Sequence, residues 1–210
     1  MNNFPSKIPV FPLSNFIMFP KTTVPLNIFE PRYIDMVNDA MKSNKFIGMV
    51  QPKTKKNDQS PPTVYEVGCL GKISDLQKSN DGRILINLTG ITRFEILEEV
   101  KNNKRYREFK VNYKNFEIDL KSVTEKQNTE MLMNKAKNFF KKNGLLLNWK
   151  EFEKLDEMQK INTLSMISPI TNEEKQKLLE SFSINDKIKT LEDIISFYLH
   201  EVNFNNQTIQ

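Results

Sequence analysis

The stretch that decides the fold is Ile8-Pro-Val-Phe-Pro-Leu-Ser-Asn-Phe-Ile-Met-Phe-Pro20, followed by Val24-Pro-Leu-Asn-Ile-Phe-Glu-Pro-Arg-Tyr33. Short apolar runs alternate with prolines here. A proline inside a helix removes a backbone hydrogen bond and clashes with the preceding turn, and it restricts the residue before it to extended geometry. The stretch therefore predicts two strands joined by a loop.

The proline at position 31 has a different role. Apolar residues follow it at helical spacing, at Tyr33, Met36, Val37, Ala40 and Met41. Proline is favoured in the first turn of a helix, where its missing N–H would have no partner in any case. We predict an amphipathic helix that begins at Pro31.

The following residues, as far as Phe116, predict a succession of short strands. The expected strands are 46–50, 64–76 with bulges at Gly68 and Gly71, 83–89, 93–97 and 106–116, with turns at 79–82 and 102–103 and a strand break at Gly90. Many short strands at close spacing after one early helix indicate a small, strongly bent β-barrel.

The period changes to helical from Ser122 onwards. Ser122 to Glu125 forms a capping-box pattern, and Gly144 is a typical helix stop. Further helices are expected over 151–165, 172–183 and 186–198, the second of them opened by a capping box at Thr171 to Glu174. We predict two domains, a β-barrel over 1–120 and a helical bundle over 121–210.

The ordered string of the first forty residues closely resembles the opening of the Lon N-terminal domain, whose members carry the pattern "PLFPL…LFPG…LPLHIFEPRY". Lys21 stands where this pattern has glycine, and Asn27 precedes Ile28. Val67-Gly68, Asp81-Gly82-Arg83, Arg93-Phe94 and the helix from Glu173 to Glu180 extend the resemblance, whereas Glu95 replaces a frequent second arginine. The resemblance implies an α+β fold: a PUA-like bent β-pseudo-barrel with one early helix, followed by a C-terminal α-helical bundle.

The residues for catalysis are missing from the sequence. His200 is the only histidine and Cys69 the only cysteine, so no His/Cys metal cluster can form. Gly68-Cys-Leu-Gly-Lys72 has too few residues between its glycines for a phosphate loop, and Ile73 follows its lysine instead of Ser or Thr. We expect no enzyme, no metal and no cofactor, and a stand-alone member without the ATPase and peptidase domains of Lon protease.

Basic residues are in excess only in the first part of the chain, where residues 1–120 carry 18 Lys and Arg against 13 Asp and Glu. Five of them cluster at Lys101, Lys104, Arg105, Arg107 and Lys110. Such a cluster is typical of a solvated hairpin, and it can also attract phosphates or acidic partners.

The resemblance implies a non-catalytic module that binds protein or peptide, with unfolded or tagged protein clients as partners and a protease or chaperone as a possible recipient. The alternatives are RNA binding, since PUA-like folds include RNA-binding modules, and a scaffold that docks a partner protein. A cytoplasmic location is expected, because the sequence shows no signal peptide, no apolar membrane span and a single cysteine.

The candidate peptide-binding residues are Phe16, Ile17, Met18 and Phe19, since consecutive residues of an extended segment cannot all face inward. The motif residues Glu30, Arg32, Tyr33, Arg93 and Phe94 are predicted to be structural, with Glu30 capping the first helix and the arginines joining barrel segments. Phe16, Phe19, Phe29 and Phe94 are expected first of all in the core.

Overall fold

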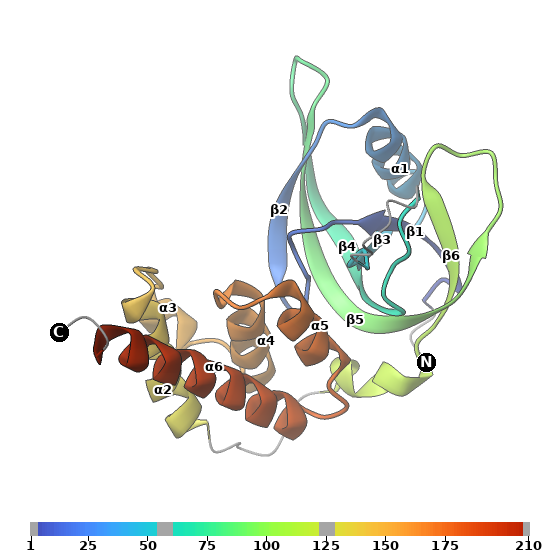
Figure 1. The fold of residues 1–210 in the computed structure, drawn as a ribbon. Helices are drawn as coiled ribbons and strands as arrows, with labels where there is room; N and C mark the ends of the chain where they lie inside the picture. Colours follow the sequence, from blue (N-terminus) through green and yellow to red (C-terminus); the bar gives the residue numbers. More distant parts are fainter. Residues whose placement is uncertain (1–3, 54–60, 122–128, 208–210) are drawn as a thin grey trace. The chain divides into compact units, whose positions relative to one another are not determined.

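The computed structural model describes residues 4–53, 61–121 and 129–207, and the chain forms two compact units, Met1–Lys121 and Ser122–Gln210. Among these described residues, the first unit holds the strands, one early α-helix and a short 3-10 helix, and the second holds only helices (Figure 1). In the described part of the chain, no helix has both the length and the apolar character needed to cross a membrane.

The first unit is a ring of strands. Its elements are β1 (Lys7–Pro12), β2 (Thr23–Ile28), α1 (Pro31–Met41), β3 (Phe46–Val50), β4 (Val67–Lys78), β5 (Ile84–Val100), β6 (Arg107–Asn112) and the short 3-10 helix η1 (Lys114–Leu120). The strand order is β2-β5-β4-β3-β1-β6, and β6 also pairs with β5, which closes the ring. The β1–β3 pair is parallel and the other pairs are antiparallel. The predicted pseudo-barrel with one early helix is confirmed.

The strand β5 runs without a break through Gly90. A β-carbon at Gly90 would lie 2.2 Å from the Phe19 carbonyl oxygen, so only glycine lets the loop before β2 lie against this strand. The Gly90 N–H donates to the Thr22 carbonyl and its carbonyl accepts from the Lys21 N–H, both at 2.8 Å. The expected strand break is therefore wrong, and the glycine marks a close approach of two backbones.

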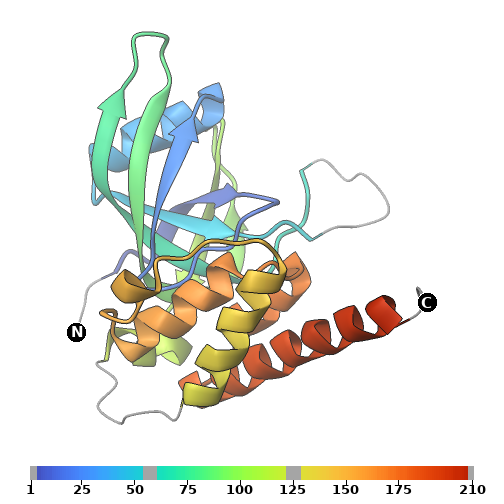
Figure 2. The ribbon, with the colours of Figure 1, turned by 90° about the vertical axis from the view of Figure 1, so that its left-hand side faces the viewer.

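The hairpin between β4 and β5 projects beyond the ring (Figure 2). Its turn at Ser79–Gly82 is the predicted one, with Gly82 at φ +86°. A bulge interrupts the β4–β5 register between Leu70 and Gly71, next to one of the two predicted bulge sites.

Large apolar side chains fill the inside of the ring. They form one cluster of buried residues, Ile8, Val10, Val50, Leu70, Phe94, Phe109 and Val111. The helix α1 adds its predicted face, with Tyr33, Met36, Val37 and Ala40 buried. Cys69 is fully buried as a small core residue.

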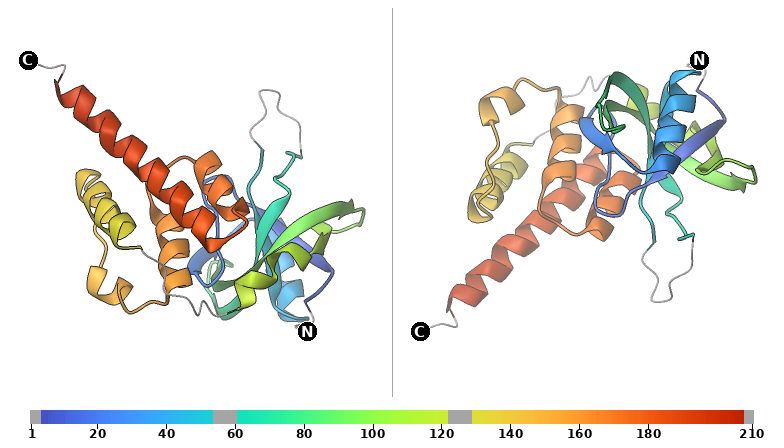
Figure 3. Two further views of the ribbon diagram at one scale, coloured as in Figure 1. Left: turned by 90° about the horizontal axis from the view of Figure 1, so that it is seen from below. Right: turned by 90° about the horizontal axis from the view of Figure 1, so that it is seen from above.

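The second unit consists of α2 (Glu130–Lys142), α3 (Trp149–Phe152), α4 (Glu157–Ile167), α5 (Asn172–Glu180) and α6 (Ile184–Gln207). α6 contacts α2, α4 and α5 (Figure 3). Its Leu191 and Ile195 are fully buried. Helical residues at 129–207 confirm the predicted change of period, whereas the capping pattern at Ser122–Glu125 lies outside the described residues.

Capping residues set the helix boundaries in this unit. The predicted helix over 151–165 is two helices, because Asp156 forms a capping box with Gln159 and starts α4 anew. The capping box of Thr171 with Glu174 is confirmed at the start of α5. Gly144 follows α2 with φ +66°, as a helix stop requires.

Candidate functional site

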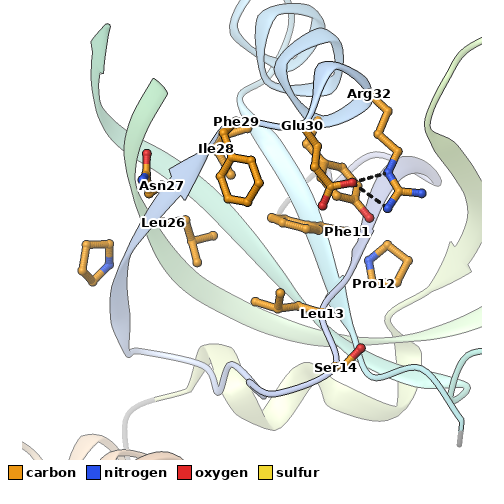
Figure 4. A pocket seen from close by; sticks show the side chains of 12 residues that line it. Phe11, Pro12, Leu13, Ser14, Leu26, Asn27, Ile28, Phe29, Glu30 and Arg32 are labelled. Atoms are coloured by element: carbon orange, nitrogen blue, oxygen red, sulfur yellow. Dashed lines mark hydrogen bonds and ion pairs between the residues drawn. The ribbon is translucent and has the colours of Figure 1, made fainter. Parts of the chain in front are cut away.

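The candidate site is a groove on the first unit between the end of β1 and the strand β2, with a volume of about 400 Å³. The residues from Phe11 to Ser14 form one side, β2 residues from Pro25 to Ile28 form the other, and the start of α1 closes one end. Figure 4 shows Leu13 and Phe11 on the first side facing Leu26 on the second. We call this the β1–β2 groove.

β2 has an open edge along this groove. It pairs with β5 on one side only, and no other described strand pairs with it. Because antiparallel residues alternate in direction, and Thr22 already accepts a hydrogen bond from Gly90, the backbone groups of Val24, Leu26 and Ile28 point to β5. The backbone groups of Thr23, Pro25 and Asn27 then point to the open edge.

Pro25 fits this assignment. Proline has no N–H to donate to a ladder, so within a sheet it is confined to positions that face away from the partner strand. The open edge therefore offers the N–H groups of Thr23 and Asn27 and three carbonyl oxygens. An extended chain can add to such an edge through main-chain hydrogen bonds.

The groove also carries an exposed aromatic side chain. Phe29 is 63% exposed, although the sequence favoured a core position, and that expectation is wrong. Ile28 is buried on the inner face, so its neighbour in an extended chain must point outward. Phe29 is the first residue after β2 and lines the groove beside Phe11 (Figure 4).

The motif residues at the start of α1 form a small network. Glu30 makes no side-chain cap to the helix, contrary to our expectation, and instead accepts from Arg32 Nε at 3.0 Å. The Arg32 guanidinium lies 4.6 Å from the centre of the Tyr33 ring, which in turn packs 4.1 Å from the ring of Phe11. Burial raises the pKa of Tyr33, so its hydroxyl remains a protonated donor.

A buried amide holds the β1 side of the groove. Gln51 is 6% exposed, and its Nε2 donates to the Ser14 carbonyl at 3.0 Å. The N–H of Leu13 donates to the Val50 carbonyl at 3.1 Å. These bonds from β3 and the residue after it fix the position of the apolar wall that Leu13 contributes.

The predicted peptide-binding loop is mostly buried. Ile17, Met18 and Phe19 are each at most 4% exposed and Phe16 is half-buried, so this loop does not offer the apolar surface that we expected. The loop is held close to Gly90 on β5 by the backbone bonds described above, which turns its side chains into the unit. It lies outside the β1–β2 groove.

The other two motif residues, Arg93 and Phe94, also lie away from the groove. Arg93 is 2% exposed and pairs with buried Asp119 of η1, at 2.9 Å from Nε and 2.8 Å from Nη2. Its guanidinium stacks 4.6 Å from the Phe116 ring. Phe94 is fully buried in the core cluster. Both residues hold β5 in the first unit.

The basic cluster is largely neutralised by neighbouring carboxylates. Lys104 lies 3.0 Å from Glu108, Arg107 lies 2.6 Å from Glu99, and Lys110 pairs with Glu98. Arg105 is more loosely placed, at 3.6 Å from Asp35. A surface for a nucleic-acid backbone requires uncompensated positive charge, and paired residues supply little of it.

Two solved structures that share this architecture are Lon N-terminal domains. The N-terminal domain of Lon protease from the Mycobacterium avium complex superposes with a TM-score of 0.63 at 16% identity, over 90% of this chain and 98% of that one. The Lon N-terminal domain protein of Xanthomonas campestris gives a TM-score of 0.59 at 20% identity, over 91% and 98%. The fold is therefore that of Lon N-terminal domains.

The sequence comparison identifies the family. The profile described as "ATP-dependent protease La (LON) substrate-binding domain" matches residues 7–196, so the chain belongs to this family. It is 24% identical to the Lon protease of Dictyoglomus thermophilum over 94% of its length, and 28% identical to Lon protease 1 of Hydrogenovibrio crunogenus over 97%. The chain spans about a quarter of the length of these two curated relatives, 24% and 26%.

Proposed function

We propose that the chain is a non-catalytic module that binds extended polypeptide segments in the β1–β2 groove. The observation that carries this proposal is the open edge of β2 beside an apolar groove of about 400 Å³. A client would add as a further strand through main-chain hydrogen bonds, while Leu13, Leu26 and Phe29 receive its apolar side chains. Family membership supports a protein substrate in general.

We propose a module without catalysis because the segment that most resembles a phosphate loop has a structural role. Gly68 to Lys72, the segment with some likeness to a phosphate loop, lies inside β4. A β-carbon at Gly68 would meet the Met49 carbonyl at 2.5 Å and one at Gly71 would meet Leu88 at 2.5 Å. These glycines serve the close packing of strands. As a separate part of the proposal, we infer that the module binds clients for transfer to a protease or chaperone.

Two substitutions test the groove with the fold intact. Phe29→Asp places a charge on an exposed apolar contact, and Asn27→Pro removes an N–H that points to the open edge, as Pro25 already does naturally. Each should weaken binding of a labelled, permanently unfolded alkylated protein about tenfold, as expected for one lost apolar contact or main-chain bond.

The control places the same charge outside the groove. Leu146→Asp charges a fully exposed leucine of the second unit. It should not weaken binding, and a folded control protein should not bind at all. Unchanged affinity in both Phe29→Asp and Asn27→Pro would exclude the β1–β2 groove as the binding site.

A further inference from the structure

A second, smaller pocket adjoins the β1–β2 groove, with a volume of about 170 Å³ against about 400 Å³ for the groove. The two share Pro12, Ser14, Arg32 and Tyr33. The rest of the lining of the second pocket is Val10, Pro52, Pro61, Pro62, Arg105, Tyr106 and Arg107. We call it the arginine pocket, because three arginines line it and no carboxylate is among the described residues that line it.

One of the three arginines is fixed by protein partners. Arg107 donates to both carboxylate oxygens of Glu99, at 2.7 and 2.6 Å, and to the Pro62 carbonyl at 2.8 Å. Its side chain is 20% exposed. Glu99 therefore offsets the charge of Arg107, which forms a fixed part of the pocket wall and keeps few further donors.

The other two arginines keep donors for a ligand. Arg32 engages Glu30 through Nε and Nη2, at 3.0 and 2.8 Å, and a guanidinium has five N–H donors. Among the described residues, Arg105 has one ion pair, 3.6 Å from Asp35, and its side chain is 71% exposed. An anion that reaches the pocket can therefore take up charge-assisted hydrogen bonds without breaking a buried pair.

A tyrosine completes the polar lining beside Arg32. The hydroxyl of Tyr33 stays protonated because burial raises its pKa, so it can act as a donor beside an anion. Tyr106 is already engaged, since its hydroxyl donates to Asp39 at 2.8 Å. The pocket is thus rich in donors, and the groove that leads into it is mostly apolar.

We propose that the arginine pocket binds the C-terminal carboxylate of a polypeptide whose preceding apolar residues occupy the β1–β2 groove. This inference rests on the proposed function and names its substrate class: unfolded chains that end in an apolar segment. A planar carboxylate accepts well from guanidinium groups, which favours this anion. The arginine pocket is less than half the size of the groove, so it suits the end of a chain better than a chain that passes through.

The direction of the client follows from this arrangement. Arg32 and Tyr33 lie just beyond Ile28, the last residue of β2. A client that ends at Arg32 must run parallel to β2 along its open edge. Parallel addition to an edge strand uses the same backbone groups of Thr23, Pro25 and Asn27.

The test compares three labelled peptides of alternating leucine and serine by fluorescence anisotropy with the full chain. The first ends in a free carboxylate, the second in a carboxamide, and the third in a carboxamide with one internal serine replaced by glutamate. We expect the free acid to bind about tenfold more tightly than either amide, as charge-assisted hydrogen bonds allow. In Arg105→Gln this preference should fall to about threefold or less, while binding of the amide peptide is unchanged.

Lys101→Gln is the matched control, because it removes one positive charge from the same hairpin at a residue outside the arginine pocket. Lys101→Gln should keep the full preference for the free acid over the amide, and Arg105→Lys should keep part of that preference. Equal binding of acid and amide by the unaltered chain would overturn this inference and leave the proposed function intact. Equal binding of the free acid and the internal glutamate peptide would overturn the assignment to a chain terminus, and no binding of any peptide would overturn both proposals.

Discussion

Lys21 shows how a single residue stores strain in this fold. Its φ of +61° lies in the left-handed region, which costs a residue with a β-carbon about 1–2 kcal/mol. The Lon N-terminal pattern that the sequence resembles has glycine at this position. The conformation is imposed by the Lys21 N–H bond to the Gly90 carbonyl at 2.8 Å.

Lys21→Gly should therefore raise the free energy of unfolding by about 0.5–1 kcal/mol, the relief of strain less the added entropy of an unfolded glycine. Urea unfolding followed by circular dichroism measures it. The control is Lys42→Gly, where φ is −80° and the same change should destabilise. A destabilised Lys21→Gly would show that the side chain of Lys21 outweighs its strain.

The buried pair of Arg93 and Asp119 is the second position where one residue decides stability. Both side chains are at most 3% exposed, and Asp119 also accepts from the Arg93 backbone N–H at 2.9 Å. Asp119→Ala should lower the free energy of unfolding by about 3–5 kcal/mol, because it leaves a guanidinium buried without its counter-charge.

The control for this prediction is Glu98→Ala, which removes an ion pair whose two side chains are each 59% exposed. Its cost should stay below about 1 kcal/mol. Chemical unfolding of the two variants side by side separates the effects. Similar losses of unfolding free energy in the two variants would contradict this prediction, because burial of the Arg93–Asp119 pair would then add nothing to stability.

At the scale of elements, β5 depends on Gly90. A methyl group there would overlap the Phe19 carbonyl, which belongs to backbone and cannot rotate away. Gly90→Ala should lower the free energy of unfolding by about 2 kcal/mol or more, since overpacking costs about 1–3 kcal/mol even where side chains can adjust. Thr89→Ala, one residue earlier in the same strand, should cost clearly less, and equal losses would contradict the close-approach explanation.

Elements whose signal is local could be predicted from the sequence. Pro31 with its apolar spacing gave α1, Gly82 gave the β4–β5 turn, and Thr171 with Glu174 gave the start of α5. The strand break predicted at Gly90 is wrong, because glycine is needed there for the close approach of a loop that lies some 70 residues earlier in the chain. The split at Asp156 carries a local signal, the capping box with Gln159, that the apolar period obscured.

The candidate site could be predicted only in part. Pro25 and the alternation around it indicate a strand, but they do not say which of its edges stays unpaired. That depends on the pairing of β2 with β5 and on the closure of the ring by β6, contacts between distant residues. The same long-range packing buries Met18 and Phe19, and leaves Phe29 exposed.

At the scale of the whole molecule, the net charge of +5 comes from the basic excess in residues 1–120, which supports RNA as an alternative partner, and five of these basic residues cluster at 101–110. In the structure, this positive charge is a weaker argument for RNA binding. Four of the five basic residues of the cluster lie within 4 Å of a carboxylate: Lys104, Arg105, Arg107 and Lys110. A net charge that is distributed in this way gives weak, general attraction instead of a phosphate-binding face.

The full chain should accordingly bind an unfolded protein with little dependence on ionic strength and bind single-stranded RNA far more weakly. Groove binding through apolar contacts and main-chain hydrogen bonds releases few counterions, whereas RNA binding through six or more phosphate contacts would lose about a thousandfold in affinity between about 50 and 200 mM salt. Anisotropy titrations of both labelled partners across that range measure the two slopes. RNA binding that is tighter than client binding, with a steep salt slope that Lys101→Gln and Lys104→Gln reduce, would reverse the order of the two functions and move the binding surface from the β1–β2 groove to the β5–β6 hairpin.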